Sequence, residues 1–279
     1  MHVPRSSHLL PGGSPADIGI LGPLRPRFGG KEAPLSGIKL RSILAVLAYR
    51  VESEVRRDEL IEELDLTRTT GDAVNALHAH VARLRRWLLA NGGRPDTLET
   101  VNSAYRLNID RTAVDAHRFV DLVELALNLA PGTPTVVAAI LEDALSLWRG
   151  EALFGTFDGP LVATAADQLH QWRNAARETL IDAWIALDKN QQVILNARQF
   201  IAEDPLNEFI RSRHIIALRR MGRYAEAAEA YQSAERALWD ELAVRPGDEL
   251  RSAVSGPDSG VGWYAPRSQP LPAHPRAVS

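Results

Sequence analysis

The sequence predicts a mainly α-helical fold with a small β component. Short apolar runs divided by Gly22-Pro23 indicate strands near the N-terminus, and three amphipathic segments follow them. Two further strand-like runs come next, and from Asp115 onward apolar residues recur with the helical period. Strands, three helices and a hairpin in this order are the layout of a winged helix-turn-helix. The rest of the chain predicts an all-α domain of tetratricopeptide-like helix pairs.

The length of 279 residues predicts two domains, and 45% hydrophobic with 24% charged residues is an ordinary globular composition. We assign residues 17–111 to the winged helix and residues 112–254 to the helical domain. The ends of the chain, residues 1–16 and 255–279, are rich in Pro, Gly and Ser. Because such segments have little to bury, we expect them to be disordered tails.

The chain contains no cysteine, which excludes disulfides, thiolate zinc sites and cysteine nucleophiles. The N-terminus lacks the apolar segment of a signal peptide. No apolar run approaches the length of about 18 residues that a membrane-spanning helix needs. We therefore expect a cytoplasmic protein that does not bind membranes.

The net charge of −3 is distributed unevenly. Residues 17–110 hold 14 Arg or Lys and 13 Asp or Glu, which gives +1. Residues 111–250 hold 14 basic and 21 acidic residues, which gives −7. The difference in charge indicates that the two halves have different functions. A net charge of +1 is nevertheless far below the basicity that by itself identifies a nucleic-acid-binding domain.

The elements of the winged helix are predicted from apolar spacing and from the polar breaks between apolar segments. In the second helix, apolar residues occupy one side, so the acids of the other side, Glu63 among them, are expected to face solvent. The predicted strands and helices cover residues 18–21, 24–28, 38–49, 57–65, 72–89, 97–101 and 105–109, with a polar break at residues 67–71.

Six helices are predicted in the second half, separated by Gly, Pro and Asp-rich breaks. Residues 204–242 look like a tetratricopeptide unit, because Pro205 precedes the first helix and Gly222 and Ala227 allow the second to pack closely. Stacked helix pairs form concave surfaces for partners rather than catalytic clefts. The predicted helices cover residues 116–129, 135–148, 161–187, 191–201, 206–221 and 224–242.

The third helix of the N-terminal domain carries three arginines and, after its capping residue Asp72, no acid. Alanines beside arginines suit a helix lying in the major groove of DNA, where Arg binds guanine or phosphate. The alternative is an exposed face whose arginines are only solvated; the position of this helix just before a hairpin favours DNA. The residues expected to face DNA are Asn75, Ala79, Ala82, Arg83 and Arg86, with His78, His80 and Arg85 on the flanks.

The hairpin offers a second contact with DNA. Tyr105 and Arg106 lie on its return strand, where a wing approaches the backbone or the minor groove. A hairpin that merely closes the domain is an almost equally good interpretation of the same residues.

No catalytic, cofactor or metal site is predicted. Gly29-Gly30-Lys31 lacks the first glycine and the Ser or Thr of a phosphate-binding loop. His78 and His80 are two residues apart on a helix and point roughly 200° apart, whereas two ligands of one metal ion need i, i+4 spacing. The acids between Glu52 and Glu63 have no nucleophile or histidine beside them and indicate a solvated face. An enzymatic function has no supporting residues.

Several of these segments together resemble the Streptomyces antibiotic regulatory protein family, over residues 17–254. In the N-terminal half, the matching motifs lie at residues 20–24, 39–45, 58–61, 75–86 and 105–107. In the second half, residues 147–150, 221–227 and 240–247 resemble the bacterial transcriptional activator domain that follows in that family. Each motif is modest alone, but so many in this order are specific.

The resemblance implies a response-regulator-type winged helix, an activator that binds tandem direct repeats near a promoter and recruits RNA polymerase holoenzyme. It implies groove and phosphate contacts for His80, Arg83, Arg85 and Arg86, and polymerase contact for the loop of residues 65–72. It assigns dimerisation, as a homodimer, or signal input to the helical domain.

The chain departs from the family pattern at two places. Asp65 stands where the family usually has Trp, and Ser103-Ala104 stand where it has Pro-Gly. With the near-neutral N-terminal half, these departures leave a second function open, that of a non-catalytic protein that binds a related regulator or a kinase. The forkhead-associated or ATPase module of larger relatives is not expected in the 25 residues or so after Ser255.

Overall fold

The computed structural model describes residues 16–130, 132–255 and 271–272, and the chain divides into two compact units. Unit 1 holds the described residues up to Arg118 together with Leu147–Leu169, and unit 2 holds Phe119–Ser146 with the described residues from His170 onward. The predicted tails lie almost wholly outside the described residues; at their inner edges, Ala16 begins a strand and Ser255 ends a helix.

A first small sheet in unit 1 is formed by β1 (Ala16–Gly19), β2 (Arg25–Phe28) and β3 (Lys31–Glu32), antiparallel and in that order. The first two strands were predicted, with slightly different bounds. The third was missed because its two residues are both exposed and carry no apolar alternation. Gly29 and Gly30 have φ of 55° and 78°, which lets the chain turn tightly between β2 and β3.

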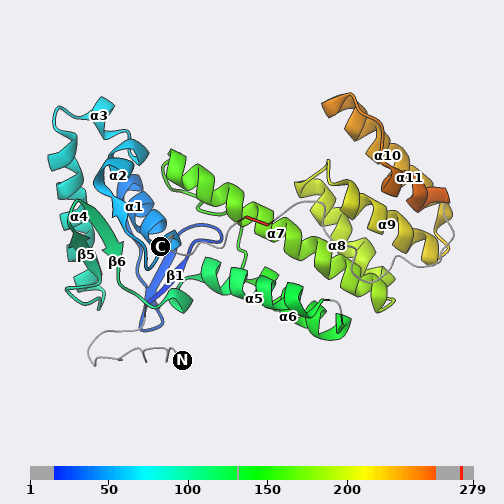
Figure 1. Ribbon diagram of the computed structural model, residues 1–279, viewed down its shortest axis with the longest axis horizontal. Coiled ribbons are helices and arrows are strands. Elements are labelled where there is room, and N and C mark those ends of the chain that lie inside the picture. The colour runs from blue at the N-terminus through cyan, green and yellow to red at the C-terminus, as the bar shows by residue number, and fades with distance from the viewer. Residues whose placement is uncertain (1–15, 131, 256–270, 273–279) are drawn as a thin grey trace, which may run out of the picture. The chain divides into compact units, whose positions relative to one another are not determined.

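Four helices follow in unit 1: α1 (Ile38–Tyr49), α2 (Arg57–Glu63), α3 (Leu66–Thr69) and α4 (Ala73–Ala90) (Figure 1). The bounds of α1 are those predicted. The predicted polar break at residues 67–71 instead contains α3, anchored by the fully buried Leu66. Asp65, in the left-handed conformation at φ 48°, separates α3 from α2.

The hairpin predicted after the third helix is present and belongs to a three-stranded antiparallel sheet. Its strands are β4 (Val55–Arg56), β5 (Leu98–Val101) and β6 (Ala104–Leu107), in the order β4-β6-β5. Asn102, at φ 53°, turns the chain between β5 and β6. The short strand β4 was not predicted. Its two residues form a strand only because they pair with β6, which follows in the sequence after α2, α3 and α4.

The core of unit 1 joins the helices to both sheets. Its fully buried side chains come from β1, from α1 to α4 and from the segments between them, and α1 packs against α4. Burial of each large aliphatic side chain contributes about 2 kcal/mol. The largest of these side chains are Ile18, Ile20, Leu21, Ile43, Leu44, Leu47, Leu60, Leu64, Leu66 and Leu77.

Residues Leu147–Leu169, far from the winged helix in sequence, are part of unit 1. The backbone N–H groups of Arg149 and Leu153 donate to the carbonyls of Leu21 and Ile20, both at 2.8 Å. The carboxylate of Asp115, at the start of α5 (Asp115–Leu129), accepts from the N–H of Ile20 at 2.7 Å and from Arg149 at 2.9 Å. We call residues 147–169 the strap, because they bind the end of β1 to the start of α5 through these contacts.

The predicted solvent-facing position of Glu63 is wrong. Its side chain is fully buried, and Oε2 accepts a hydrogen bond of 2.7 Å from the N–H of Leu161, in the first turn of α7 (Pro160–Ala186). A carboxylate at this position compensates unpaired N–H groups of the helix N-terminus. Burial raises the pKa of Glu63, and hydrogen bonds from the backbone of Leu161 and Val162 partly offset this rise. The periodicity of α2 could not reveal a partner about 100 residues away.

Unit 2 is built of helices, as predicted. Besides parts of α5 and α7, it contains α6 (Pro134–Ser146), α8 (Asn190–Glu203), α9 (Glu208–Arg220), α10 (Tyr224–Leu242) and α11 (Asp248–Ser255). The bounds of α10 are those predicted, whereas α11 was missed because Pro246-Gly247 indicated a break without showing that a helix resumes.

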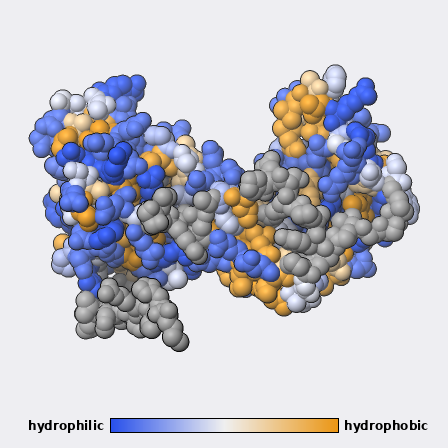
Figure 2. Space-filling model, viewed as in Figure 1, coloured by the Kyte–Doolittle hydropathy of each residue, from blue (hydrophilic) through white to orange (hydrophobic). Residues whose placement is uncertain are grey.

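Helix α9 is central to unit 2 and packs against α8, α10 and α11. Its Arg213 is 2% exposed, and Nε donates to Asp182 Oδ1 of α7 at 2.6 Å, while the guanidinium also pairs with Glu249 of α11. A buried charge is tolerated only when it is paired in this way. Hydrophobic residues reach the surface over α10 (Figure 2). The large side chains of Tyr224, Trp239 and Leu242 on this helix are also exposed.

None of the helices in the described residues is long and apolar enough to span a membrane.

Candidate nucleic-acid interface

Helix α4 has one buried and one exposed face, as its sequence predicted. Leu77, Val81, Leu84 and Leu88 are buried, and Val74 is half-buried. The opposite face is open to solvent and combines two cations with small and polar side chains. Its exposed residues are Asn75, His78, Ala79, Ala82, Arg83 and Arg86.

Asp72 caps α4, as predicted. Its Oδ1 accepts from the N–H of Asn75 at 2.9 Å, and its Oδ2 accepts from the Asn75 side-chain amide at 2.5 Å. A capping aspartate satisfies one of the free N–H groups of the first turn and stabilises a helix by about 1 kcal/mol. The contact also fixes the rotamer of Asn75 at the exposed end of the helix.

Arg83 and Arg86 have no carboxylate within 4.0 Å among the described residues, unlike many arginines of unit 1. Arg25, for example, pairs with Glu32, and Arg94 pairs with Asp96. An exposed guanidinium without an acidic partner keeps its donors available for bases or phosphates.

His80 is half-buried beside these arginines. Burial lowers the pKa of His80, and the positive charges of Lys39 and Arg83 lower it further. Of its two ring nitrogens, Nδ1 is buried without a hydrogen-bond partner in the described part of the chain. Because a buried N–H without an acceptor is costly, the neutral ring with its proton on Nε2 is the favoured form.

Arg85 joins α4 to the wing instead of facing outward. Its Nε donates to the carbonyl of Leu98 at 2.9 Å and its NH2 donates to Thr100 Oγ1 at 2.6 Å, both on β5. These bonds occupy two of the donor nitrogens of the guanidinium. In this structure Arg85 therefore fixes the position of the hairpin relative to α4.

The two residues predicted on the wing lie on opposite faces of β6, because neighbouring residues of a strand alternate. Tyr105 is 3% exposed and faces the Arg85 side, where burial raises its pKa. The predicted surface contact of Tyr105 is therefore not available in this conformation. Its register partner is Thr100, the residue that Arg85 binds.

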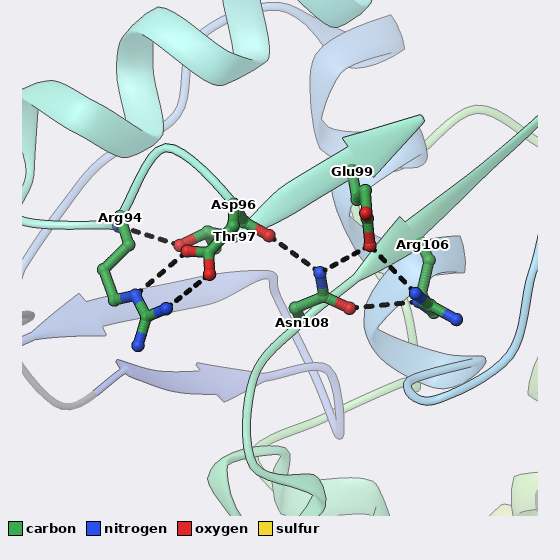
Figure 3. A network of polar contacts seen from close by, with 6 residues as sticks. All are labelled: Arg94, Asp96, Thr97, Glu99, Arg106 and Asn108. Carbon is green, nitrogen blue, oxygen red and sulfur yellow. Dashed lines mark hydrogen bonds and ion pairs between the residues drawn. The ribbon is translucent and has the colours of Figure 1, made fainter. Parts of the chain in front are cut away.

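Arg106 lies on the other face of the sheet and takes part in a network of polar contacts (Figure 3). Its NH2 donates to Glu99 Oε2 at 2.9 Å, and its Nε donates to Asn108 Oδ1 at 3.1 Å. The Asn108 amide donates to Glu99 and to the carbonyl of Asp96, at 3.1 and 2.8 Å. Glu54 is a second acid near Arg106, at 3.9 Å. The charge of Arg106 is thus compensated within the protein.

Lys39 was not among the predicted site residues, yet the structure places it beside α4. It is the second residue of α1, its Nζ donates to Thr69 Oγ1 at 3.2 Å, and its charge acts on His80. A single lysine in an amphipathic helix gives no signal in the sequence, since only the packing of α1 on α4 brings it to this position.

Within the described ranges, no group of three or more His, Cys, Asp or Glu side chains could hold a metal ion.

Comparison with known proteins places the chain among transcription regulators. Residues 114–255 match the family model described as the bacterial transcriptional activator domain. The chain is 34% identical over 243 residues to the transcriptional regulator RedD of Streptomyces coelicolor, covering 86% of this chain and 69% of RedD. It is 27% identical to the regulatory protein DnrI of Streptomyces peucetius, covering 89% of this chain and 95% of DnrI.

The fold resembles a solved structure of Mycobacterium tuberculosis EmbR bound to a low-affinity phosphopeptide. The TM-score is 0.79 at 29% sequence identity, and the match covers 86% of this chain and 64% of that chain. This similarity confirms the predicted fold class, a small N-terminal β-containing region followed by a helical domain. The matched family model and the 34% identity to RedD show that the chain belongs to the Streptomyces antibiotic regulatory protein family of transcriptional regulators.

Proposed function

We propose that α4 is the recognition helix of this regulator and enters the major groove of promoter DNA. The observation that carries the proposal is an exposed face with small side chains, on which two arginines have no acidic partner. Alanines let the helix backbone approach the base edges, and Arg83 can donate to both acceptors of a guanine. The groove-facing residues would be Asn75, His78, Ala79, Ala82, Arg83 and Arg86.

The remaining predicted contacts would support this helix. Arg85 and Tyr105 hold the hairpin against α4, and the contacts of Arg106 fix the outer face of the hairpin. The part of the wing that approaches DNA would then be its exposed turn, Asn102-Ser103.

We further propose that two copies of the chain bind tandem direct repeats as a homodimer. The DNA-binding region would be residues 17–111, and residues 112–254 would set the spacing of the copies. Two linked modules bind a pair of sites far more tightly than one module binds a single site. The acidic helical half supports this division, because a surface of net charge −7 is unsuited to DNA.

RNA polymerase would contact the segment from Asp65 to Asp72, which the structure folds into α3 and an exposed turn. Arg68 and Thr69 are exposed on it. Changes at these two positions should reduce transcription without reducing promoter affinity. In this proposal the protein acts in the cytoplasm on the nucleoid and catalyses no reaction.

The test is a binding titration of the full chain with a promoter fragment and a random fragment over a range of salt. Arg83→Ala should relax the sequence preference, at a cost of about 1–3 kcal/mol on the promoter fragment alone. Arg86→Ala should weaken binding to both fragments alike and reduce the salt slope by about 1. Arg236→Ala, an exposed arginine of α10, is the matched control and should change neither.

Two outcomes would contradict the proposal. One is wild-type protein that binds promoter and random DNA equally at physiological salt. The other is an Arg83→Ala variant that folds normally and keeps the full preference.

A further inference from the structure

Asn75 lies in the first turn of α4, away from the arginines of the exposed face. At 1.5 Å per residue, it is about 12 Å along the helix axis from Arg83 and about 16 Å from Arg86. The N-terminal residues of a recognition helix are those that contact base edges. The side chain of Asn75 is short and reaches a base only if the backbone comes close, and the small, exposed Ala79 one turn later leaves room for that approach.

The hydrogen bond to Asp72 decides which way the amide of Asn75 faces. A carboxylate only accepts hydrogen bonds, so the amide nitrogen lies against Asp72 Oδ2, at 2.5 Å. The amide oxygen is thereby turned away from the carboxylate, and no donor binds it among the described residues. Of the two N–H donors of the amide, Asp72 binds one and the other is left. The exposed amide therefore offers one acceptor and one donor.

This combination of one acceptor and one donor matches adenine. In the major groove adenine presents its N6 amino group as a donor and N7 as an acceptor, and an asparagine amide binds both. Guanine presents two acceptors, N7 and O6, which suit arginine instead. The negative charge of Asp72 beside the amide repels these two electronegative atoms, so the first turn of α4 favours adenine over guanine.

We propose that Asn75, oriented by Asp72, binds one adenine of the promoter site through N6 and N7. The inference rests on the proposed function of α4 and adds the base that the first turn of this helix recognises. Asp72 is a positioning residue in this proposal, because it acts on the base only through the amide of Asn75. Arg83 would read a guanine at a separate position.

A purely structural role for Asn75 is the competing explanation, because its amide also binds the residue that caps the helix. Asn75→Ala separates the two explanations. The variant keeps the backbone N–H that donates to Asp72 Oδ1, so the cap remains. A structural role predicts lower stability with an unchanged base preference, whereas base recognition predicts that the preference is lost at one base pair.

Asn91 provides a matched control at the other end of α4. Its amide donates to the carbonyl of Trp87 at 2.8 Å, and it lies about 160° around the helix from Asn75. Asp72→Ser tests the positioning role, because a serine hydroxyl also caps a helix but then has no second oxygen for the Asn75 amide.

We would measure the affinity of the full chain and of these three variants for the promoter fragment. The same measurement would be made on fragments in which each base pair of the site is changed in turn. Thermal unfolding would establish that each variant is folded. A further fragment carries 7-deazaadenine, which has a C–H group in place of N7, at the position where Asn75→Ala loses its preference.

At one A·T pair, a change of base should weaken binding of the wild-type chain by about 10-fold and leave Asn75→Ala unaffected. Asp72→Ser should reduce the discrimination at that pair by about 3-fold, because its amide is free to rotate. Asn91→Ala should match the wild type at every position. The 7-deazaadenine fragment should bind the wild type more weakly than the unmodified fragment and should not affect Asn75→Ala.

The proposal is overturned if Asn75→Ala keeps the wild-type preference at every base pair, or if the preference it loses is for a G·C pair. It is also overturned if 7-deazaadenine weakens Asn75→Ala as much as the wild type, or if Asp72→Ser keeps the full discrimination.

Failure of this inference is distinct from failure of the proposed function. In the first case Arg83→Ala still relaxes the sequence preference while Asn75→Ala does not. In the second case the wild-type chain itself shows no preference for the promoter fragment.

Discussion

Arg85 of α4 donates a hydrogen bond of 2.6 Å to Thr100 Oγ1 of β5, and this contact joins the proposed recognition helix to the hairpin. It is supported by a second bond from Arg85 to the carbonyl of Leu98 at 2.9 Å. A residue whose type and position suggest a DNA contact thus serves in this structure to hold the hairpin against α4.

Removing this link should loosen the hairpin. Arg85→Gln removes two hydrogen bonds of the guanidinium and should lower the free energy of unfolding by about 2 kcal/mol. Thr100→Val removes only one of them and should lower it by about 1 kcal/mol. Faster amide hydrogen exchange in β5 and β6 should accompany the loss. In a double-mutant cycle the two changes should be non-additive. Strictly additive changes would show that the two side chains do not interact in solution.

Arg106 should behave as part of the hairpin and not as a DNA contact. Its guanidinium is compensated by Glu99 and Glu54, so Arg106→Gln should leave the salt slope of DNA binding unchanged. The effect on stability should be below about 1 kcal/mol, because partly exposed ion pairs contribute little. Arg86→Ala is the comparison and should lower the slope. A slope reduced by about 1 in Arg106→Gln would mean that the guanidinium leaves Glu99 for a phosphate.

The strap should be needed for the stability of unit 1. Asp115 has a side chain that is 5% exposed and pairs with Arg149 at 2.9 Å. Arg149→Gln would leave a buried carboxylate without its cation and should destabilise the protein by about 3 kcal/mol in urea unfolding. Arg245→Gln, an exposed arginine, is the control. The backbone N–H groups of Ile20 and Leu21 also donate to Asp115, at 2.7 and 3.2 Å. A loss no greater than that of the control would show that these two N–H groups satisfy the carboxylate without Arg149.

His214 should make unit 2 sensitive to acid. Burial lowers the pKa of His214 to about 4, and the charges of Arg198, Arg223 and Arg211 contribute to the shift. The unfolded chain binds this proton near the ordinary pKa of about 6.5. Stability is therefore complete above that pH and is lost as the pH falls toward 4.

The expected loss over this window is about 3 kcal/mol, measured as the difference in free energy of unfolding at the two ends. His214→Gln should remove this part of the pH dependence, whereas His78→Gln, at an exposed position, should not. An unchanged profile in His214→Gln would show that the pKa of His214 is the same in the folded and the unfolded protein.

The helices were largely predictable because amphipathic periodicity is a local property. The bounds of α1 and α10 and the capping role of Asp72 agree with the structure. The elements that were missed are short or depend on distant partners. Strand β4 exists because it pairs with β6. Helix α3 is held in place by the burial of Leu66.

In the candidate site, too, the local features were predictable and the contacts with distant residues were not. The exposed face of α4 follows from its apolar stripe, so Arg83 and Arg86 were correctly expected at the surface. Arg85, Tyr105 and Arg106 carry side chains of the right chemistry, but their partners decide their roles. Those partners lie on other strands and loops, and a one-dimensional pattern contains no information about them.

The fold class, the helical periods and the solvent-facing side of α4 followed from the sequence alone, because they depend on residues a few positions apart. The family followed from many short motifs in a fixed order along the chain. The tertiary structure alone decided that Glu63 binds the first turn of α7, that Arg149 of the strap reaches Asp115, and that Lys39 of α1 donates to Thr69 of α3. These relationships join residues separated by tens of positions, and only the packing of whole elements against a shared core brings such side chains together.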